Sequence, residues 1–247
     1  MTPTRKAALA GGIFYLITFA SSIPSWFFLQ PVLSDPNYIV GPGADTQVAI
    51  GALLDVVTAF AGIGCAVALF SVIRRAHEGL ALGYVTTRLM EGAVIMVGVL
   101  AELAVMSMRQ NGATGAEATA LIATGRGLIA VHDWSFLFGP GLMPVLNALM
   151  LATLLYRARL VPRLIPAVGL IGAPLLAVST LGTMFGVNDT QSAFTGLATM
   201  PIFFWELSVG LWMTFKGFSP SAPILAAESV SSGARGATAP ATAGGAA

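Results

Sequence analysis

Three ionisable side chains, Arg88, Glu91 and Glu102, interrupt a stretch that is otherwise apolar enough for a lipid bilayer, TTRLMEGAVIMVGVLAELAVM (residues 86–106). A helix turns by about 100° per residue, so positions eleven apart differ by only about 20°, and Glu91 and Glu102 share one face. Arg88 lies one turn before Glu91, and Tyr84 lies one turn before Arg88. An ionised side chain facing lipid costs roughly 2.5–3.5 kcal/mol. We therefore expect this polar stripe to face the protein interior.

The inner end of this stripe predicts a cluster of Arg88 and Glu91 with Glu206, which lies in another apolar segment. At 1.5 Å per residue, both glutamates lie about 15–16 Å from the inner boundary of their segments, so contact is permitted. A guanidinium in a low-dielectric cavity could bind a carboxylate or phosphate bidentately. We predict a candidate site for a small anionic or lipid-like ligand, lined also by Tyr84 and Asn147. Alternatively, these residues form only a structural clamp between helices, with Arg88 and Glu91 neutralising each other.

An outer polar cluster is expected where Asp55, Glu102, His132 and Asp133 approach one level of the membrane. Three carboxylates and a histidine could hold a divalent metal and an activated water, so a membrane-embedded metal-dependent hydrolase is a second alternative. The chain has no HExxH pattern, no GxSxG and no glycine-rich phosphate loop. The sequence therefore assigns no catalytic residue, metal ligand or cofactor. The simpler expectation is that Asp133 caps a helix start and that His132 lies at the membrane interface.

Composition sets the class of protein. Of the 247 residues, 56% are hydrophobic and 9% are charged, whereas soluble domains carry roughly 25% charged residues. The net charge of +1 and the lack of a basic tract exclude a nucleic-acid-binding protein. Cys65 is the only cysteine, so neither an internal disulfide nor a cysteine-based zinc site can form.

Six apolar segments are long enough to cross a bilayer as helices, and they predict an all-α, polytopic membrane helical bundle. They cover residues 7–30, 48–73, 80–108, 133–156, 164–187 and 193–215. If the chain crosses the membrane six times, eight cationic residues fall on the same side as the two termini: Arg5, Lys6, Arg74, Arg75, Arg157, Arg159, Arg163 and Lys216. Only Arg109 and Arg126 fall on the other side. Positive residues favour the cytoplasm, so both termini should be cytoplasmic and the protein should lie in the inner (plasma) membrane.

Two further segments complete the organisation. Within residues 112–131, apolar positions recur at three- and four-residue steps, which predicts a short amphipathic helix at the outer interface. Residues 1–218 form the membrane domain, and residues 219–247, rich in Ala, Gly, Ser, Pro and Thr, are expected to be a disordered cytoplasmic tail. The expected partners are membrane lipids and a small-molecule ligand. No pattern favours an oligomer, which remains open.

Three stretches together resemble a bacterial membrane family known as domain of unknown function 4386. They are HDWSFLFGPGLMPVLNALMLATLLYRARLVPRLIPAVGLIGAPL (residues 132–175), RLMEG (88–92) and PIFFWELSVGLWMTFKGF (201–218). The resemblance implies a multi-pass inner-membrane protein, and it assigns no catalytic residues. The positions that match the family pattern include Arg88, Glu91, His132, Asp133, Asn147 and Glu206.

Overall fold

The computed structural model describes residues 1–112 and 114–225, in which six helices are long and apolar enough to cross a membrane. The described residues contain no strand, so the all-α, six-helix membrane bundle predicted from the sequence is confirmed. The helices are α1 (Pro3–Ser34), α2 (Asp45–Ile73), α3 (Glu78–Asn111), α4 (Ala116–Phe136), α5 (Met143–Arg157), α6 (Leu164–Met184) and α7 (Ala193–Phe215), with short turns η1 (Tyr38–Val40) and η2 (Leu137–Leu142).

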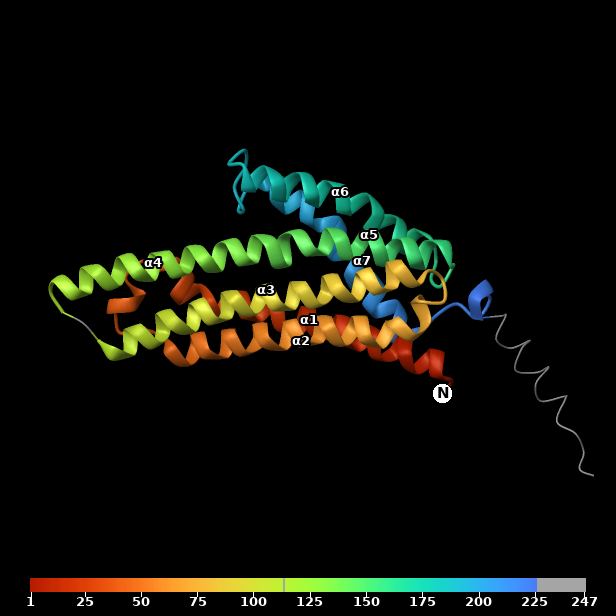
Figure 1. Cartoon of the computed structure of the whole chain (residues 1–247), viewed down its shortest axis with the longest axis horizontal. Coiled ribbons are helices and arrows are strands. Elements are labelled where there is room, and N and C mark those ends of the chain that lie inside the picture. Colours follow the sequence, from red (N-terminus) through yellow and green to blue (C-terminus); the bar gives the residue numbers. More distant parts are fainter. Residues whose placement is uncertain (113, 226–247) are drawn as a thin grey trace, which may run out of the picture.

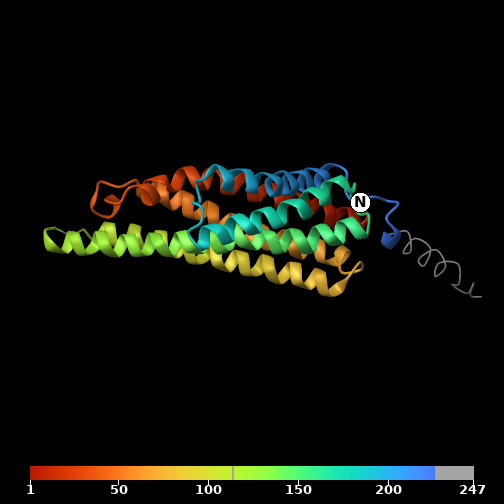
Figure 2. The same cartoon turned by 90° about the horizontal axis from the view of Figure 1, so that it is seen from above.

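The six crossings form a closed ring in which neighbours in sequence pack side by side and α7 returns to pack against α1 (Figures 1 and 2). The contact between α1 and α7 depends on Gly12. A Cβ atom there would lie 2.6 Å from the backbone nitrogen of Thr214 and 2.8 Å from the carbonyl oxygen of Gly210. Glycine thus lets two helix backbones approach closely, which stabilises helix pairs in membranes through packing.

The fourth crossing differs from the prediction. Residues 112–131 do contain a helix, but it begins at Ala116 and continues through η2 into α5, giving one helical run of 42 residues, Ala116–Arg157. It packs lengthwise along α3 instead of lying flat at an interface (Figure 1). The reason is that its apolar face, including Leu121 and Ile129, packs against Tyr38, Ile39 and other buried residues of the bundle. That face is covered by protein, so a lipid interface is not needed to bury it.

The join between α4 and α5 is a π-helical turn, η2, that contains Pro140. Proline has no backbone N–H, so an α-helical hydrogen bond is missing at this position, and the wider turn accommodates the loss. The backbone of Gly141 in this turn accepts a hydrogen bond from the hydroxyl of Thr180 on α6 at 3.2 Å. The turn therefore joins the fourth crossing to α6.

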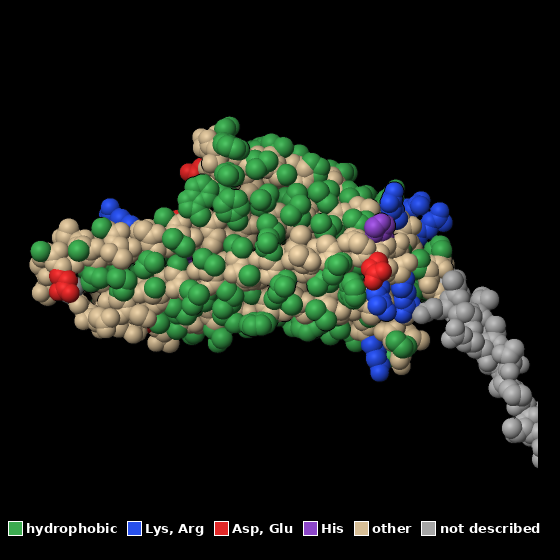
Figure 3. Space-filling model, in the orientation of Figure 1, with side chains coloured by type: hydrophobic (Ala, Val, Ile, Leu, Met, Phe, Trp, Pro, Cys, Tyr) green, Lys and Arg blue, Asp and Glu red, His purple; other side chains and the backbone are tan. Residues whose placement is uncertain are grey.

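Helix lengths indicate where the bilayer lies. α6 and α7 have 21 and 23 residues, or about 31–35 Å, close to the hydrocarbon thickness. α3 and the α4–α5 run extend well beyond the ends of α6 and α7 that lie away from the N-terminus (Figure 1). Hydrophobic side chains cover the middle of the visible face, and lysine and arginine gather at the end where α1 begins (Figure 3). The chain is therefore a multi-pass membrane protein whose N-terminus lies at the cation-rich end.

The expected tail begins at residue 219, but residues 219–225 pack against the bundle. The backbone N–H of Ser219 donates to the carbonyl of Leu160 at 2.8 Å, and Ala222 is fully buried. Residues 226–247, the remainder of the expected tail, lie outside the described residues.

Candidate functional site

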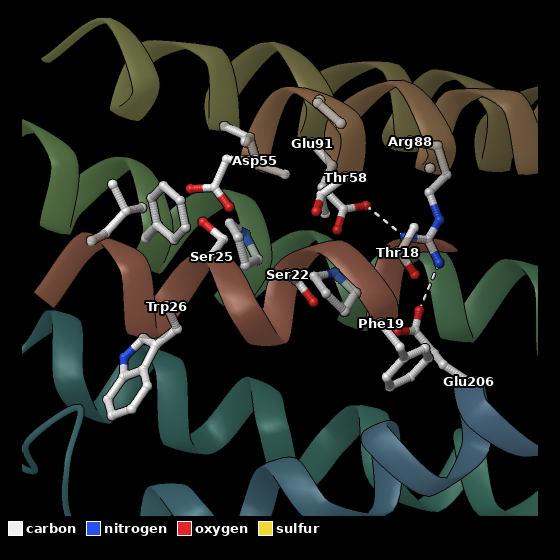
Figure 4. A pocket seen from close by; sticks show the side chains of 18 of the residues that line it. Thr18, Phe19, Ser22, Ser25, Trp26, Asp55, Thr58, Arg88, Glu91 and Glu206 are labelled. Carbon is white, nitrogen blue, oxygen red and sulfur yellow. Dashed lines mark hydrogen bonds and ion pairs between the residues drawn. The ribbon is translucent and has the colours of Figure 1, made fainter. Parts of the chain in front are cut away.

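The structure brings Arg88, Glu91 and Glu206 together as the sequence predicted. Nη1 of Arg88 donates to Oε2 of Glu91 at 3.0 Å, and Nη2 donates to Oε1 of Glu206 at 2.6 Å (Figure 4). Arg88 is 4% exposed. One guanidinium thus bridges two carboxylates from α3 and α7, and the pairing offsets much of the cost of burying it.

Other helices complete this inner cluster. Asn147 on α5 donates from its amide to Oε2 of Glu91 at 2.7 Å and accepts from the hydroxyl of Thr87 at 2.6 Å. The hydroxyl of Tyr15 on α1 accepts from Nη2 of Arg88 at 2.9 Å and lies 3.3 Å from the hydroxyl of Tyr84. Tyr84 and Asn147 therefore contact the charged group where they were expected. Four helices, α1, α3, α5 and α7, meet at this cluster.

The aromatic rings also stabilise the cation. The guanidinium carbon of Arg88 lies 5.1 Å from the centre of the Tyr15 ring and 5.7 Å from that of Tyr84, within the range of cation–π interactions. Nε of Arg88 is the one atom of its guanidinium without a hydrogen-bond partner among the described residues.

The outer polar cluster is only partly assembled. His132 is 5% exposed, and its Nε2 lies 2.9 Å from Oε1 of Glu102, which is fully buried. Asp133 contacts Nδ1 of His132 at 3.2 Å, but its side chain is 68% exposed. The expected positions of His132 at an interface and Asp133 at a helix start are wrong, because the helix begins at Ala116 and both residues lie well inside it. The structure thus brings His132 and Glu102 of the predicted outer polar cluster into contact, with His132 buried instead of at an interface.

Asp55 on α2 is the remaining member of the outer polar cluster, and it is 4% exposed. Its Oδ2 accepts no hydrogen bond within residues 1–112 and 114–225. The carboxylate points toward Ser25 on α1 (Figure 4).

The described residues contain no group of three or more His, Cys, Asp and Glu side chains arranged to hold a metal ion. Glu102 and His132 are in contact, Asp133 extends outward, and Asp55 stands apart from a complete ligand set. The geometry therefore does not support the metal-dependent hydrolase alternative, which needs three protein ligands around an open position.

A cavity of about 320 Å³ connects the two clusters inside the ring of helices. Arg88, Glu91 and Glu206 line its inner end, and Asp55 and His132 line its outer part. Much of the remaining wall is apolar or aromatic, including Phe19, Leu29, Ile95, Phe136 and Pro144. Concave, mostly apolar cavities with a few convergent polar groups are typical ligand sites.

The cavity reaches the surface of the bundle between α1 and η2. Three of its lining residues, Ser22, Trp26 and Pro140, are exposed, and Trp26 is 57% exposed. The outer ends of α6 and α7 stand away from α4 on this side (Figure 1). A molecule dissolved in the bilayer could therefore enter sideways without first crossing the aqueous phase.

The sequence reading missed the contribution of α1. Tyr15, Thr18, Ser22 and Ser25 follow one another at steps of three, four and three residues in an apolar segment, so they share one helix face. Three of them line the cavity, and Tyr15 contacts Arg88. This second polar stripe was visible in the sequence and is the signal that could have found them.

Residues 10–217 match the family described as a domain of unknown function, DUF4386. The chain belongs to this family. The match begins within α1 and ends two residues after α7, so both clusters and the whole lining of the cavity belong to the DUF4386 domain. Neither a curated protein nor a solved structure matches the chain.

Proposed function

We propose that this DUF4386 protein binds a small lipid-like molecule in its central cavity, in the inner (plasma) membrane and with both termini in the cytoplasm. The observation that carries the proposal is the cavity itself, because it combines an apolar wall, polar groups at both ends and an opening beside Trp26. Cations gathered at the end that holds the N-terminus support the orientation (Figure 3).

The geometry favours a lipid-like ligand over a simple anion. Both Nη atoms of Arg88 already donate to carboxylates, and Nη2 also donates to Tyr15. An anion could bind Arg88 bidentately only by displacing Glu91 or Glu206, and the displaced carboxylate would be left buried without its cation. Arg88 is better suited to hold the inner wall of the cavity together than to receive an anionic headgroup.

The same contacts favour the structural clamp as a second role for the inner cluster. Arg88 ties α3 to α1 and α7, while Glu91 ties α3 to α5 through Asn147. A clamp of this kind is compatible with a ligand in the cavity, since it positions the helices that enclose it.

Ligand retention through purification tests the proposal. The protein is extracted in a mild detergent, and bound molecules are identified by native mass spectrometry and solvent extraction. Ala59 is buried and lines the cavity, so Ala59→Leu should reduce the retained molecule several-fold by occupying its space. Val67→Leu is the matched control, because Val67 lies on the same helix and is exposed on the outside of the bundle.

Equal retention by wild type and Ala59→Leu, with Ala59→Leu correctly folded, would contradict a ligand in this cavity. Loss of retention in Val67→Leu but not in Ala59→Leu would place the molecule on the lipid-facing surface instead.

A further inference from the structure

Three of the hydroxyl groups that line the cavity, those of Thr18, Ser25 and Thr58, face it as hydrogen-bond acceptors, and the fourth, Ser22, is exposed. The hydroxyl of Thr18 donates to the carbonyl of Tyr15 at 2.7 Å, and that of Ser25 donates to the carbonyl of Gly51 at 2.9 Å. Thr58 has one proton, which is used either by the carbonyl of Leu54 at 3.0 Å or by the hydroxyl of Ser21 at 2.6 Å. A hydroxyl has one donor and two lone pairs, so these groups have only lone pairs left for a ligand.

Asp55 adds a stronger acceptor to this wall. It is only 4% exposed and lines the cavity, and its Oδ2 has no hydrogen-bond partner among the described residues. Buried polar atoms are nearly always hydrogen-bonded, and each exception needs an explanation. Because Asp55 lies beside the cavity (Figure 4), we favour a bound hydrogen-bond donor as the explanation.

The charges around the cavity also favour a positively charged ligand. Arg88 is shared by Glu91 and Glu206, and His132 is already opposite Glu102. Asp55 therefore has no cation of its own. Two buried nitrogen atoms of cavity-lining side chains have no hydrogen-bond partner in the described part of the chain: Nε of Arg88 and Nε2 of His132. The second of these already lies against Glu102.

We propose that the lipid-like ligand carries an ammonium group, which Asp55 binds together with the hydroxyl oxygens of Ser25 and Thr58; this inference rests on the proposed function. An ammonium has three N–H donors and no acceptor, so it complements a carboxylate flanked by hydroxyl lone pairs. Its apolar chain lies along Phe19, Ile95 and Phe136 on the cavity wall. A charge-assisted hydrogen bond of this kind is about twice as strong as a neutral one.

Three probes of equal chain length test the headgroup: n-octylammonium, n-octanol and n-octanoate. Each is titrated into the full-length protein in phosphatidylcholine nanodiscs, and the saturable rise in thermal unfolding temperature gives its apparent affinity. We expect n-octylammonium to bind roughly ten-fold or more tightly than n-octanol, and n-octanoate to bind no better than n-octanol.

Asp55→Asn should remove the advantage of n-octylammonium over n-octanol, whereas Asp189→Asn should keep it. Asp189→Asn removes the same charge from an exposed side chain that does not line this cavity, so it controls for attraction of the probe to the surface. Ser25→Ala keeps the carboxylate and should weaken n-octylammonium several-fold. If Asp55→Asn does not fold, the headgroup series on wild type and the Ser25→Ala variant still decide the question.

Equal affinity of wild type for n-octylammonium and n-octanol would overturn the ammonium site, as would an unchanged preference in Asp55→Asn. In that case, weaker binding of all three probes by Ala59→Leu would still support a lipid-like ligand in the cavity. Failure of all three probes to stabilise wild type, with no molecule retained through purification, would contradict both proposals.

Discussion

Arg88 is the residue on which the inner cluster depends. It makes two ion pairs, one hydrogen bond to a phenol and two aromatic contacts. These partners stabilise the buried charge of Arg88. If the arginine is removed, each carboxylate remains buried without a cation to offset its desolvation cost. The effect of a substitution should therefore depend on whether the partners change with it.

Arg88→Met is expected to lower the free energy of unfolding by about 3–5 kcal/mol, because Glu91 and Glu206 lose their shared cation. The triple variant Arg88→Met, Glu91→Leu, Glu206→Leu removes all three charges and should recover most of that loss. Unfolding of the purified protein by titrated denaturing detergent measures both. Arg126→Met, at an exposed outer position, is the control and should have little effect. A triple variant as unstable as the single variant would show that stranded carboxylates are not the cause.

At the scale of elements, the ring is closed by a contact between helix backbones. Gly12 lies against the main chain of α7 at Thr214 and Gly210, and neither backbone can move aside as a flexible side chain could. Most of the other neighbouring crossings are joined by a short connection, whereas α1 and α7 are held by this packing and by hydrogen bonds from Arg5 to the carbonyls of Met213 and Thr214, both at 2.7 Å. The glycine therefore permits the close approach of α1 and α7.

Gly12→Ala is expected to destabilise the protein by roughly 1–3 kcal/mol through overpacking. Gly196→Ala is the matched control on α7, because nothing lies within 4 Å of the Cβ position there and its φ is not positive. That control should be neutral or stabilising by up to about 1 kcal/mol, since alanine favours a helix over glycine. Thermal unfolding in detergent compares them, and equal effects would rule out the close α1–α7 contact.

The turn η1 covers the outer end of the bundle, and Tyr38 attaches it to α2. Its hydroxyl donates to Oδ1 of Asp45 at 2.8 Å. Burial, followed by this hydrogen bond, raises the pKa of Tyr38 from 10.0 to about 12. Because the folded-state pKa lies above the unfolded value, the neutral phenol contributes stability that is fully present below pH 10 and is lost as the pH rises through about 12.

The difference in tyrosinate absorbance between wild type and Tyr38→Phe isolates this group. We expect the difference to titrate near pH 12 in the folded protein and near pH 10 after denaturation. Between these values wild type should lose more stability than Tyr38→Phe does. A difference that titrates near pH 10 in the folded state would mean that Tyr38 is neither buried nor hydrogen-bonded to Asp45.

For the whole molecule, the distribution of cations predicts the orientation in the membrane. A reporter fused after Phe218 should be active in the cytoplasm, and a reporter inserted in residues 112–115, between α3 and α4, should be active only outside. Fluorescent-protein and alkaline-phosphatase fusions measure the two sides independently. Activity of both reporters outside would contradict the six-crossing topology, and activity of both on the sides opposite to these would reverse the orientation.

The sequence by itself determined the class of protein and predicted the central contact. Six apolar segments of sufficient length require helices in a membrane, because a backbone in hydrocarbon must satisfy its own hydrogen bonds. The spacing of Arg88, Glu91 and Glu102 placed one face of α3 inward, and equal depth permitted the predicted contact with Glu206, which the structure contains. These inferences rest on helix geometry and the cost of exposing charge to lipid, which are both local properties.

Only the tertiary structure decided what each apolar face packs against. Residues 116–131 are amphipathic, and such a face can be buried equally well by lipid or by protein. Packing against α3 and η1 extended the fourth crossing, and this turned His132 inward toward Glu102. The same arrangement left Oδ2 of Asp55, beside the cavity, without a hydrogen-bond partner among the described residues. Helix order and side-by-side packing are long-range properties, so the periodicity of a single segment does not contain them.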